Sequence, residues 1–573
     1  MKNFCKTAAI GLCAAALFSV QAQIFVRSNL AGYYPNAEKR IVVMSSSDIS
    51  AKPWKITDEN GTVADEGKIG KSIAGKGDHS PLAFNYEVFF SKISKEGKYR
   101  FNIDGVEESY QIAVTKNPYS EAISSSLRWL RTQRSGTKDV LDRQPAHFGD
   151  STAFVYYREG KEKDSEWSED ENGKTFDLMG GWYAGGDFTK MTSLIAYTSY
   201  CLIKAYNIAP ESFSKKYSKS SLVDILDEAK FGLDYLLKVM PNDNDFIVNV
   251  GGYDSENGVR LPHEDIMEGK RTAYSILSSS DMGLAAAALA AGSAAFKSID
   301  AAFAEKCKSQ SIKIYNKIIS EKLVPEWLEK DYPLHPDESD KDNLLLASAE
   351  LYNLTGDADY LSKSKAYSDK LEAAGWAGWE VLNMPAQALI ADKHNNAKKL
   401  FKEDLDDFLN NQNEQGNVWK LPLEYTVNGL YNCFVIGISA GLYEKAFGGN
   451  TYDGLVLDVL NYDFGLNNWG VSFTAVPSIK QSVKRFNLPV YKLQTRLFPE
   501  GAVSIGPCDR EAHDEESKWI LDDIRVNYCY PFNTKAVVFL DHYDDYMTME
   551  ARINGAAENI YLMTLANTIF GGK

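Results

Sequence analysis

The chain has 573 residues, with 62 Lys and Arg against 78 Asp and Glu, and a net charge of −16 at pH 7. This acidic balance disfavours a nucleic acid or an anionic membrane surface as a partner, whereas a neutral polysaccharide is compatible with it. The length exceeds what one ordinary hydrophobic core holds, so we expect two or more domains. Hydrophobic residues at 44% and charged residues at 24% are typical of a soluble globular protein.

The N-terminal segment is predicted to be a signal peptide that is cleaved near Ala22. Lys2 and Lys6 precede an apolar run over residues 8–20, which is too short to cross a bilayer. Residues 1–22 are therefore expected to be removed. The mature protein is expected to be secreted, periplasmic or at the cell surface, with no membrane anchor.

Two of the seven cysteines lie in the predicted signal peptide, which leaves five. An odd number in an exported chain implies at least one free thiol. Cys508 and Cys529 flank an acidic segment and could form a disulfide, and the sequence leaves this open. The absence of a Cys-x-x-Cys motif gives no indication of a zinc knuckle or a redox site.

Residues 23–117 are predicted to form a β-sandwich. Short alternating or continuous apolar stretches are separated by turn residues, and several such strands in about 90 residues favour two packed sheets. No flexible linker follows near residues 116–118, so we expect the two domains to pack together. The predicted strands cover residues 41–44, 54–57, 86–90, 99–103 and 110–114.

Beyond residue 118 the apolar period changes from two to about 3.6. Many helices with no convincing strand pattern between them predict an all-α domain, in which a ring of helix pairs shares one core. We expect no parallel sheet beyond residue 120. The predicted helices cover residues 193–206, 222–239, 280–296, 301–319, 342–354, 360–374, 379–392, 400–410, 429–446, 451–465 and 534–540 onward.

A glycine-rich turn precedes the first long helix of this domain. Residues 180–187 contain four glycines, the rings of Trp182 and Tyr183, and the carboxylate of Asp187. Glycines permit a tight turn and a close approach to a ligand, and Asp187 supplies an acceptor or a base. On the residues alone, a structural turn with a capping aspartate is the more frequent interpretation.

This turn resembles the catalytic turn of glycoside hydrolase family 9, the cellulase family, which reads Gly-Gly-Trp-Tyr-Asp-Ala-Gly-Asp. The segments 26–35 and 96–99 resemble the immunoglobulin-like domain that precedes many family 9 catalytic domains. The resemblance implies an immunoglobulin-like β-sandwich over residues 23–117 and an (α/α)6 barrel over residues 118–573. Further segments that resemble the family, in the family's order, are 349–356, 460–467, 499–503 and 506–507.

The resemblance also implies an inverting glycosidase that acts on β-1,4-glucan. An inverting enzyme needs a base and an acid roughly 6.5–9.5 Å apart. Asp187 matches the base, whereas Ala184 stands where the family has a helper aspartate. The family's acid is the glutamate of a late Asn-Glu pair, and an alignment through Asp522 and Asp523 puts Tyr528 there. A phenol with a pKa of about 10 is a poor acid.

Two functions therefore stay open: a hydrolase with altered or weak activity, and a catalytically inactive relative that binds glucan chains. We expect Asp187, Tyr528 and Trp182 to line one cleft. A replacement acid from the acidic segment 511–523 is the alternative, although a solvated acidic loop is the favoured interpretation of that segment.

The candidate sugar-binding residues are Trp182, Tyr183, Trp376, Trp379 and Arg485. The first two belong to the turn, and Arg485 lies where the family carries a histidine-containing loop. Trp376 and Trp379 could form a platform for a sugar ring or belong to the core, with similar odds.

No cofactor is predicted. The run Pro241–Asp245 could hold a structural calcium ion, but it lacks the spacing of an EF-hand loop, so a polar turn is favoured.

Overall fold

The computed structural model describes residues 23–160, 166–217, 220–252, 258–267, 269–326, 339–414, 416–523 and 527–572. The predicted signal peptide lies outside these residues and stays a prediction. Strands make up the first part of the described chain, and the change to helices falls between Val114 and Ser120.

The N-terminal domain is a sandwich of two antiparallel sheets, as predicted. One sheet has the order β1-β2-β5 and the other β4-β3-β6-β7. In β3, Trp54 and Ile56 are buried between the sheets while Lys55 between them is exposed. The strands are β1 (Ile24–Arg27), β2 (Arg40–Ser45), β3 (Pro53–Asp58), β4 (Val63–Lys68), β5 (Phe84–Phe89), β6 (Gly97–Ile103) and β7 (Ser109–Val114).

Strand β2 is buried on both faces, which explains its continuous apolar sequence. Ile41 and Val43 belong to the core of the sandwich, whereas Val42 and Met44 belong to the core of the helical domain. The two domains therefore pack directly on one another along this strand.

Polar contacts fix the relative position of the domains. The guanidinium of Arg40 pairs with Asp458 at 2.8 Å and donates to the carbonyls of Val418 and Trp419 at 3.1 and 3.0 Å. Arg40 is almost fully buried. A planar guanidinium that satisfies several acceptors at once favours one arrangement of the domains.

The helical domain is an (α/α)6 barrel, as the resemblance implied. The inner helices are α2 (Thr192–Ile208), α4 (Ser279–Phe296), α6 (Lys341–Thr355), α8 (Asn383–Ala388), α10 (Gly429–Phe447) and α15 (Ile553–Ala566). The outer helices are α1 (Ser120–Gln133), α3 (Asp224–Leu236), α5 (Ala301–Glu321), α7 (Ala358–Ser368), α9 (Asn395–Gln412) and α11 (Asp453–Asp463).

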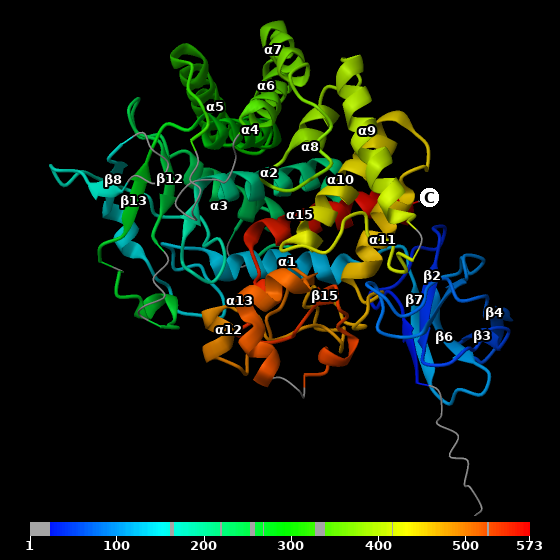
Figure 1. Cartoon of the computed structure of the whole chain (residues 1–573). Helices are drawn as coiled ribbons and strands as arrows, with labels where there is room; N and C mark the ends of the chain where they lie inside the picture. The colour runs from blue at the N-terminus through cyan, green and yellow to red at the C-terminus, as the bar shows by residue number, and fades with distance from the viewer. Residues whose placement is uncertain are drawn as a thin grey trace, which may run out of the picture.

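Contacts between the inner helices close a ring in the order α2-α4-α6-α8-α10-α15, and α15 returns to α2. Each inner helix also packs against one outer helix, so that the last helix of the chain pairs with the first. Figure 1 shows α15, in red, among the inner helices, with the sandwich at one side of the barrel.

Small residues allow the inner helices to approach closely. A Cβ on Gly437 of α10 would lie 2.9 Å from the side chain of Leu562 in α15. A Cβ on Gly441 would lie 2.6 Å from Leu565. Because contacts below about 3 Å cost repulsion, larger residues here would push the two helices apart.

The expectation that no parallel sheet follows residue 120 is wrong. Strands β10, β8, β13, β12 and β11 form one sheet in that order with β9 beside β8, and β13 runs parallel to β8. The sheet lies on the side of the barrel away from the sandwich (Figure 1). The strands are β8 (Ala153–Arg158), β9 (Trp167–Glu169), β10 (Thr175–Phe176), β11 (Lys190–Met191), β12 (Ile247–Val250) and β13 (Thr272–Ser275).

Two predicted helices and one predicted loop also differ. Residues 534–540 contain strand β15 (Val537–Val538), which pairs with β14 (Cys508–Asp509). The acidic segment expected to be a loop forms helix α13 (Arg510–Asp523), and α8 is shorter than predicted. Two further short helices are α12 (Pro489–Leu493) and α14 (Tyr546–Met549).

The five cysteines of the described chain are free thiols and buried, so Cys508 and Cys529 are not bridged. Among the described residues, no helix is long and apolar enough to cross a membrane.

Candidate active site

The glycine-rich turn closes on itself and on the first residue of the last helix. The amide of Ala184 donates to the carbonyl of Thr189 at 2.7 Å, and the amide of Thr189 donates to Oδ1 of Asp187 at 3.1 Å. The amide of Ile553, where α15 begins, donates to the carbonyl of Ala184 at 3.1 Å. Asp187 is half-buried, so its carboxylate is held by the turn and still reaches solvent.

The two rings of the turn lie in the core. Trp182 and Tyr183 are 0% and 1% exposed. The indole Nε1 of Trp182 donates to Glu228 at 3.1 Å, and the hydroxyl of Tyr183 contacts Nδ1 of His147. The prediction that these two rings bind sugar is therefore corrected: they anchor the turn, and neither has an accessible face for stacking.

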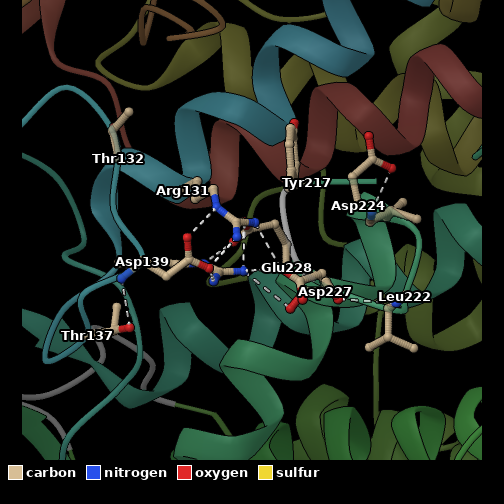
Figure 2. Close-up of polar contacts among 12 residues, drawn as sticks. Arg131, Thr132, Thr137, Asp139, Tyr217, Leu222, Asp224, Asp227 and Glu228 are labelled. Carbon is tan, nitrogen blue, oxygen red and sulfur yellow. Dashed lines mark hydrogen bonds and ion pairs between the residues drawn. The ribbon is translucent and has the colours of Figure 1, made fainter. Parts of the chain in front are cut away.

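The partner of the buried indole belongs to a dense ionic network, shown in Figure 2. Arg131 and Arg134, at the end of α1, are nearly buried and pair with Asp227 at 2.9 and 2.7 Å. Arg134 also pairs with Glu228 at 2.9 Å and with Asp139 at 3.0 Å. Two cations thus offset three carboxylates, and the network ties the turn to α1 and α3.

Beneath the turn lies a second buried group of charges. Lys190 is 0% exposed, pairs with Asp150 at 2.6 Å, and donates to the carbonyls of Leu178 and Gly180 at 2.6 and 3.0 Å. Burial lowers the pKa of Lys190 to about 8, although Asp150 opposes this shift. Burial acts to raise the pKa of Asp150, but its cationic neighbours hold it below its usual value.

Arg271, the residue directly before β13, joins this group. Its Nε donates to Asp150 at 3.1 Å, and its Nη2 donates to the carbonyl of Phe188 at 2.7 Å. Phe188 follows Asp187 directly and has a φ of 60°, a left-handed conformation that is unfavourable for a bulky residue. The guanidinium thus binds the backbone at the strained position next to the candidate base.

Glu550 faces the turn, and sequence reasoning missed it. The position that a Cβ would take on Gly185 is 2.9 Å from Oε1 of Glu550. The side chain of Glu550 is 20% exposed. This glutamate, which follows Met549 rather than an asparagine, is the only acidic residue between Asp545 and Glu558. Its place directly before the last buried helix is the signal that could have identified it.

Arg552 binds the other oxygen of this glutamate. Its Nε and Nη2 lie 2.9 and 2.8 Å from Oε2 of Glu550. The charge of Glu550, and to a lesser extent that of Asp187, raises the pKa of Arg552. Arg552 is therefore electrostatically coupled to both candidate catalytic carboxylates.

Tyr528 and Arg485 come together on Asp541. The phenol of Tyr528 donates to Oδ2 of Asp541 at 2.7 Å, and the amide of Arg485 donates to Oδ1 at 2.7 Å. Tyr528 is 46% exposed, and its partial burial together with the neighbouring Cys529 and Asp541 raises its pKa above the usual value. Glu550 therefore replaces Tyr528 as the candidate acid, because the phenol holds its proton more tightly still.

The segment around Asn487 lies against both the glycine-rich turn and the residue before Glu550. The amide of Asn487 donates to the carbonyl of Met549 at 2.9 Å, and its own carbonyl lies 3.1 Å from the position of a Cβ on Gly186. Arg485 is two residues away and exposed. That Asp187 and Tyr528 line one cleft stays a prediction.

The two tryptophans differ. Trp379 is 8% exposed and packs in the barrel core, whereas Trp376 is half-buried. Burial raises the pKa of Glu380, and Trp376 and Arg552 beside it oppose that shift. Trp376 is thus the tryptophan that remains a candidate for sugar contact.

Two further predictions concern a replacement acid in the segment 511–523 and a calcium ion at residues 241–245. Glu511, Glu515 and Glu516 lie on exposed positions of α13, and Glu516 accepts a hydrogen bond from Tyr546 at 3.0 Å. Asp245 of the candidate calcium run is already bound by protein donors, among them Tyr157 at 2.6 Å. Within the described residues, no three His, Cys, Asp or Glu side chains are arranged to hold a metal ion.

A barrel of paired helices, a rigid turn that carries a carboxylate and a glutamate that opposes it together define a protein of the glycosidase-barrel class, because paired carboxylates are the groups that such enzymes use. The sequence model of glycosyl hydrolase family 9 matches residues 119–563, and that of the cellulase N-terminal ig-like domain matches residues 21–108. The chain therefore belongs to glycosyl hydrolase family 9, and the resemblance seen in the sequence is confirmed.

Curated relatives include "Endoglucanase 15" of Arabidopsis thaliana, 29% identical over 296 residues, covering 49% of this chain and 54% of the relative. "Endoglucanase D" of Acetivibrio thermocellus is 21% identical over 365 residues, covering 61% and 55%. The chain thus spans about half the length of these relatives. "Cellodextrinase" of Butyrivibrio fibrisolvens is 23% identical over 400 residues, covering 64% and 68%.

Solved structures share the fold along almost the whole chain. A metagenome-derived glycoside hydrolase family 9 endoglucanase has a TM-score of 0.77 at 20% identity and covers 96% of this chain and 99% of its own. A structure of AaCel9A in complex with cellobiose-like isofagomine has a TM-score of 0.76 at 17% identity, covering 95% and 99%.

Proposed function

We propose that this protein is a secreted hydrolase of β-1,4-glucan in which Asp187 is the base and Glu550 the acid. The observation that carries the proposal is the position of Glu550, whose Oε1 lies against Gly185, two residues before Asp187. A base and an acid on opposing segments suit a reaction that needs both at once.

In the proposed reaction Asp187 accepts a proton from water while the water oxygen bonds to the anomeric carbon. The glycosidic C–O bond breaks, and Glu550 gives its proton to the departing oxygen. The configuration at the anomeric carbon inverts, because water attacks the face opposite the leaving group.

The choice of substrate is supported by the relatives' names, endoglucanase and cellodextrinase, and by the cellobiose-like compound bound to AaCel9A. The acidic net charge of −16 is compatible with a neutral polysaccharide. Trp376 is the aromatic residue that we assign to sugar contact, since it is half-buried rather than in the core.

We expect the activity to be weaker than that of a family member with the complete turn. Ala184 replaces an aspartate that would orient the attacking water. Arg552 also occupies one oxygen of Glu550, and that ion pair is lost whenever the glutamate takes up a proton. Both features disfavour the state that is ready to react.

The test is incubation of the mature protein with a soluble β-1,4-glucan, with new reducing ends counted over time. Proton NMR of the first product formed should show the α anomer, as inversion requires. Asp187→Asn should lower the rate about 10²–10⁴-fold. If the wild type releases no reducing ends yet binds cello-oligosaccharides, the alternative of a catalytically inactive glucan-binding relative is correct.

A further inference from the structure

We propose that Asp150, Lys190 and Arg271 form a buried clamp that fixes the backbone on both sides of Asp187, and that they are positioning residues for the reaction at that carboxylate. The inference rests on the proposed function, because it names what keeps the base in place. It concerns three buried side chains, which act through the turn.

The clamp grips the turn at its two ends. Lys190 donates to the carbonyls of Leu178 and Gly180, where the turn begins. Arg271 donates to the carbonyl of Phe188, one residue after the candidate base. Asp150 binds both cations, one on each carboxylate oxygen, so it links the contacts at the two ends of the turn.

Apolar packing alone would stabilise the fold at least as well at this place. Exchanging a buried ion pair for well-packed apolar residues is often neutral or stabilising, because the charges lose their hydration. Here the charged atoms converge on three backbone carbonyls of a single turn. They also hold Phe188 at a φ of 60°, which a bulky side chain adopts only under constraint.

Charged groups from several elements surround the clamp lysine. Asp150 comes from the 3-10 helix η1 (Phe148–Thr152), Arg271 from the residue before β13, and Lys238 from the residues after α3. The ring of Tyr235 on α3 lies 5.0 Å from its ammonium. Burial, and to a lesser extent the two neighbouring cations, lowers the pKa of Lys190 to about 8, while Asp150 opposes the shift.

The clamp should therefore loosen at alkaline pH. When Lys190 loses its proton, its attraction to Asp150 ends and its hydrogen bonds to the two carbonyls weaken. The kcat of the wild type should fall above pH 8 while KM stays constant, since the bound sugar does not touch the clamp.

The test compares Lys190→Met with Lys204→Met. Lys204 lies on α2, the helix that follows Lys190, and pairs with the buried Glu350 at 2.9 Å, so it is a comparable lysine–carboxylate pair away from the turn. Lys190→Met should lower kcat at least 10-fold with little change in KM, because a misplacement of about 1 Å can cost about 10² in rate. The pH profile of Lys190→Met should lack the step near pH 8. Lys204→Met should keep the wild-type kcat and the step near pH 8.

Amide hydrogen exchange over residues 178–190 gives a reading that does not need activity. Exchange should rise in Lys190→Met and stay at the wild-type rate in Lys204→Met. If exchange rises as expected but no variant hydrolyses glucan, the clamp is supported and the proposed function fails. If the wild type is active and Lys190→Met changes neither exchange nor kcat, the clamp is refuted.

Should Lys190→Met fail to fold, Arg271→Lys replaces it. A lysine there keeps the charge but cannot reach both Asp150 and the carbonyl of Phe188 with the geometry of a guanidinium. Faster exchange at residues 187–189 with a reduced kcat supports the clamp. Exchange and kcat at wild-type levels would refute it.

Discussion

The two sides of the candidate site are held in different ways. The turn that carries Asp187 is bound by buried groups from α1, α3, η1 and α15 and by Arg271 before β13, and its own rings lie in the core. Opposite it, Glu550 and Arg552 are 20% and 34% exposed and bind chiefly to one another. The proposed base is thus fixed by the fold, whereas the proposed acid belongs to a pair of side chains that can rearrange.

The largest expected effect separates the acid from the residue that the sequence suggested. Glu550→Gln should lower kcat on β-glucan about 10²–10⁴-fold, because the leaving oxygen then has no proton donor. Tyr528→Phe should change kcat less than about 3-fold, since its phenol is bound to Asp541 and holds its proton tightly. Initial rates of reducing-end release measure both.

A substrate with an aryl leaving group sharpens the assignment. A leaving group of low pKa needs little help from an acid, so Glu550→Gln should recover most of its rate on such a substrate, and Asp187→Asn should not. If Tyr528→Phe loses as much activity as Glu550→Gln, the acid has been assigned to the wrong residue.

The turn was readable from the sequence because its chemistry is local. Four glycines, two rings and a carboxylate within residues 180–187 form a pattern that few folds require by chance. What the pattern did not reveal is which way the rings point. Aromatic residues such as Trp182 and Tyr183 suit both a sugar-binding surface and a hydrophobic core. Only their contacts with Glu228 and His147 show that they belong to the core.

The proposed acid, Glu550, could not be identified from the sequence, because a single glutamate carries no local pattern. Two Asp-Asp pairs precede the last helix, and the alignment used Asp522 and Asp523 rather than Asp544 and Asp545. The second pair directly precedes α14 and Glu550: Asp545 is buried and accepts a hydrogen bond from Thr548 at 2.6 Å. A buried carboxylate of this kind is visible only once the chain is folded.

The elements of the fold likewise fall into those that the sequence predicts and those that it does not. Regular helices and the sandwich followed from the apolar period, because each has its own repeating pattern. The parallel pair of β8 and β13 did not, since these strands are short and lie more than a hundred residues apart. Their pairing depends on the barrel that brings them together.

The next prediction concerns the approach of Glu550 to the turn. Gly185→Ala places a Cβ 2.9 Å from Oε1 of Glu550, so the glutamate or the turn has to shift. The backbone of Gly185 does not require a glycine conformation, so strain of the main chain is not the cause. We expect kcat to fall about 10-fold with KM nearly unchanged, as a displacement below 1 Å implies.

The matched control is Gly70→Ala in the sandwich, where a Cβ would have no atom within 4 Å. Its kcat should equal that of the wild type. Unchanged activity in Gly185→Ala would mean that Glu550 does not act from the position seen here.

The smallest expected effect compares how two buried carboxylates contribute to the free energy of unfolding. Asp150 binds two cations, whereas Asp281, at the start of α4, has the hydroxyls of Ser278 and Ser193 beside it, and burial raises its pKa to about 7. Asp150→Asn should cost about 3–5 kcal/mol, because it leaves buried cations without a counter-charge. Asp281→Asn should instead stabilise the protein by about 1–3 kcal/mol at pH 8, because it removes a buried charge.

The sign of the pH dependence follows from proton binding. Between its unfolded pKa and about 7, Asp281 binds more protons in the folded than in the unfolded state, so its contribution to the unfolding free energy falls as the pH rises. The advantage of Asp281→Asn should therefore be largest at pH 8 and shrink towards pH 4. Urea unfolding at both values measures it. If Asp281→Asn is less stable than the wild type at pH 8, the protein must compensate the charge of Asp281 as well as it compensates that of Asp150. Compensated buried charge would then not be a special feature of the turn.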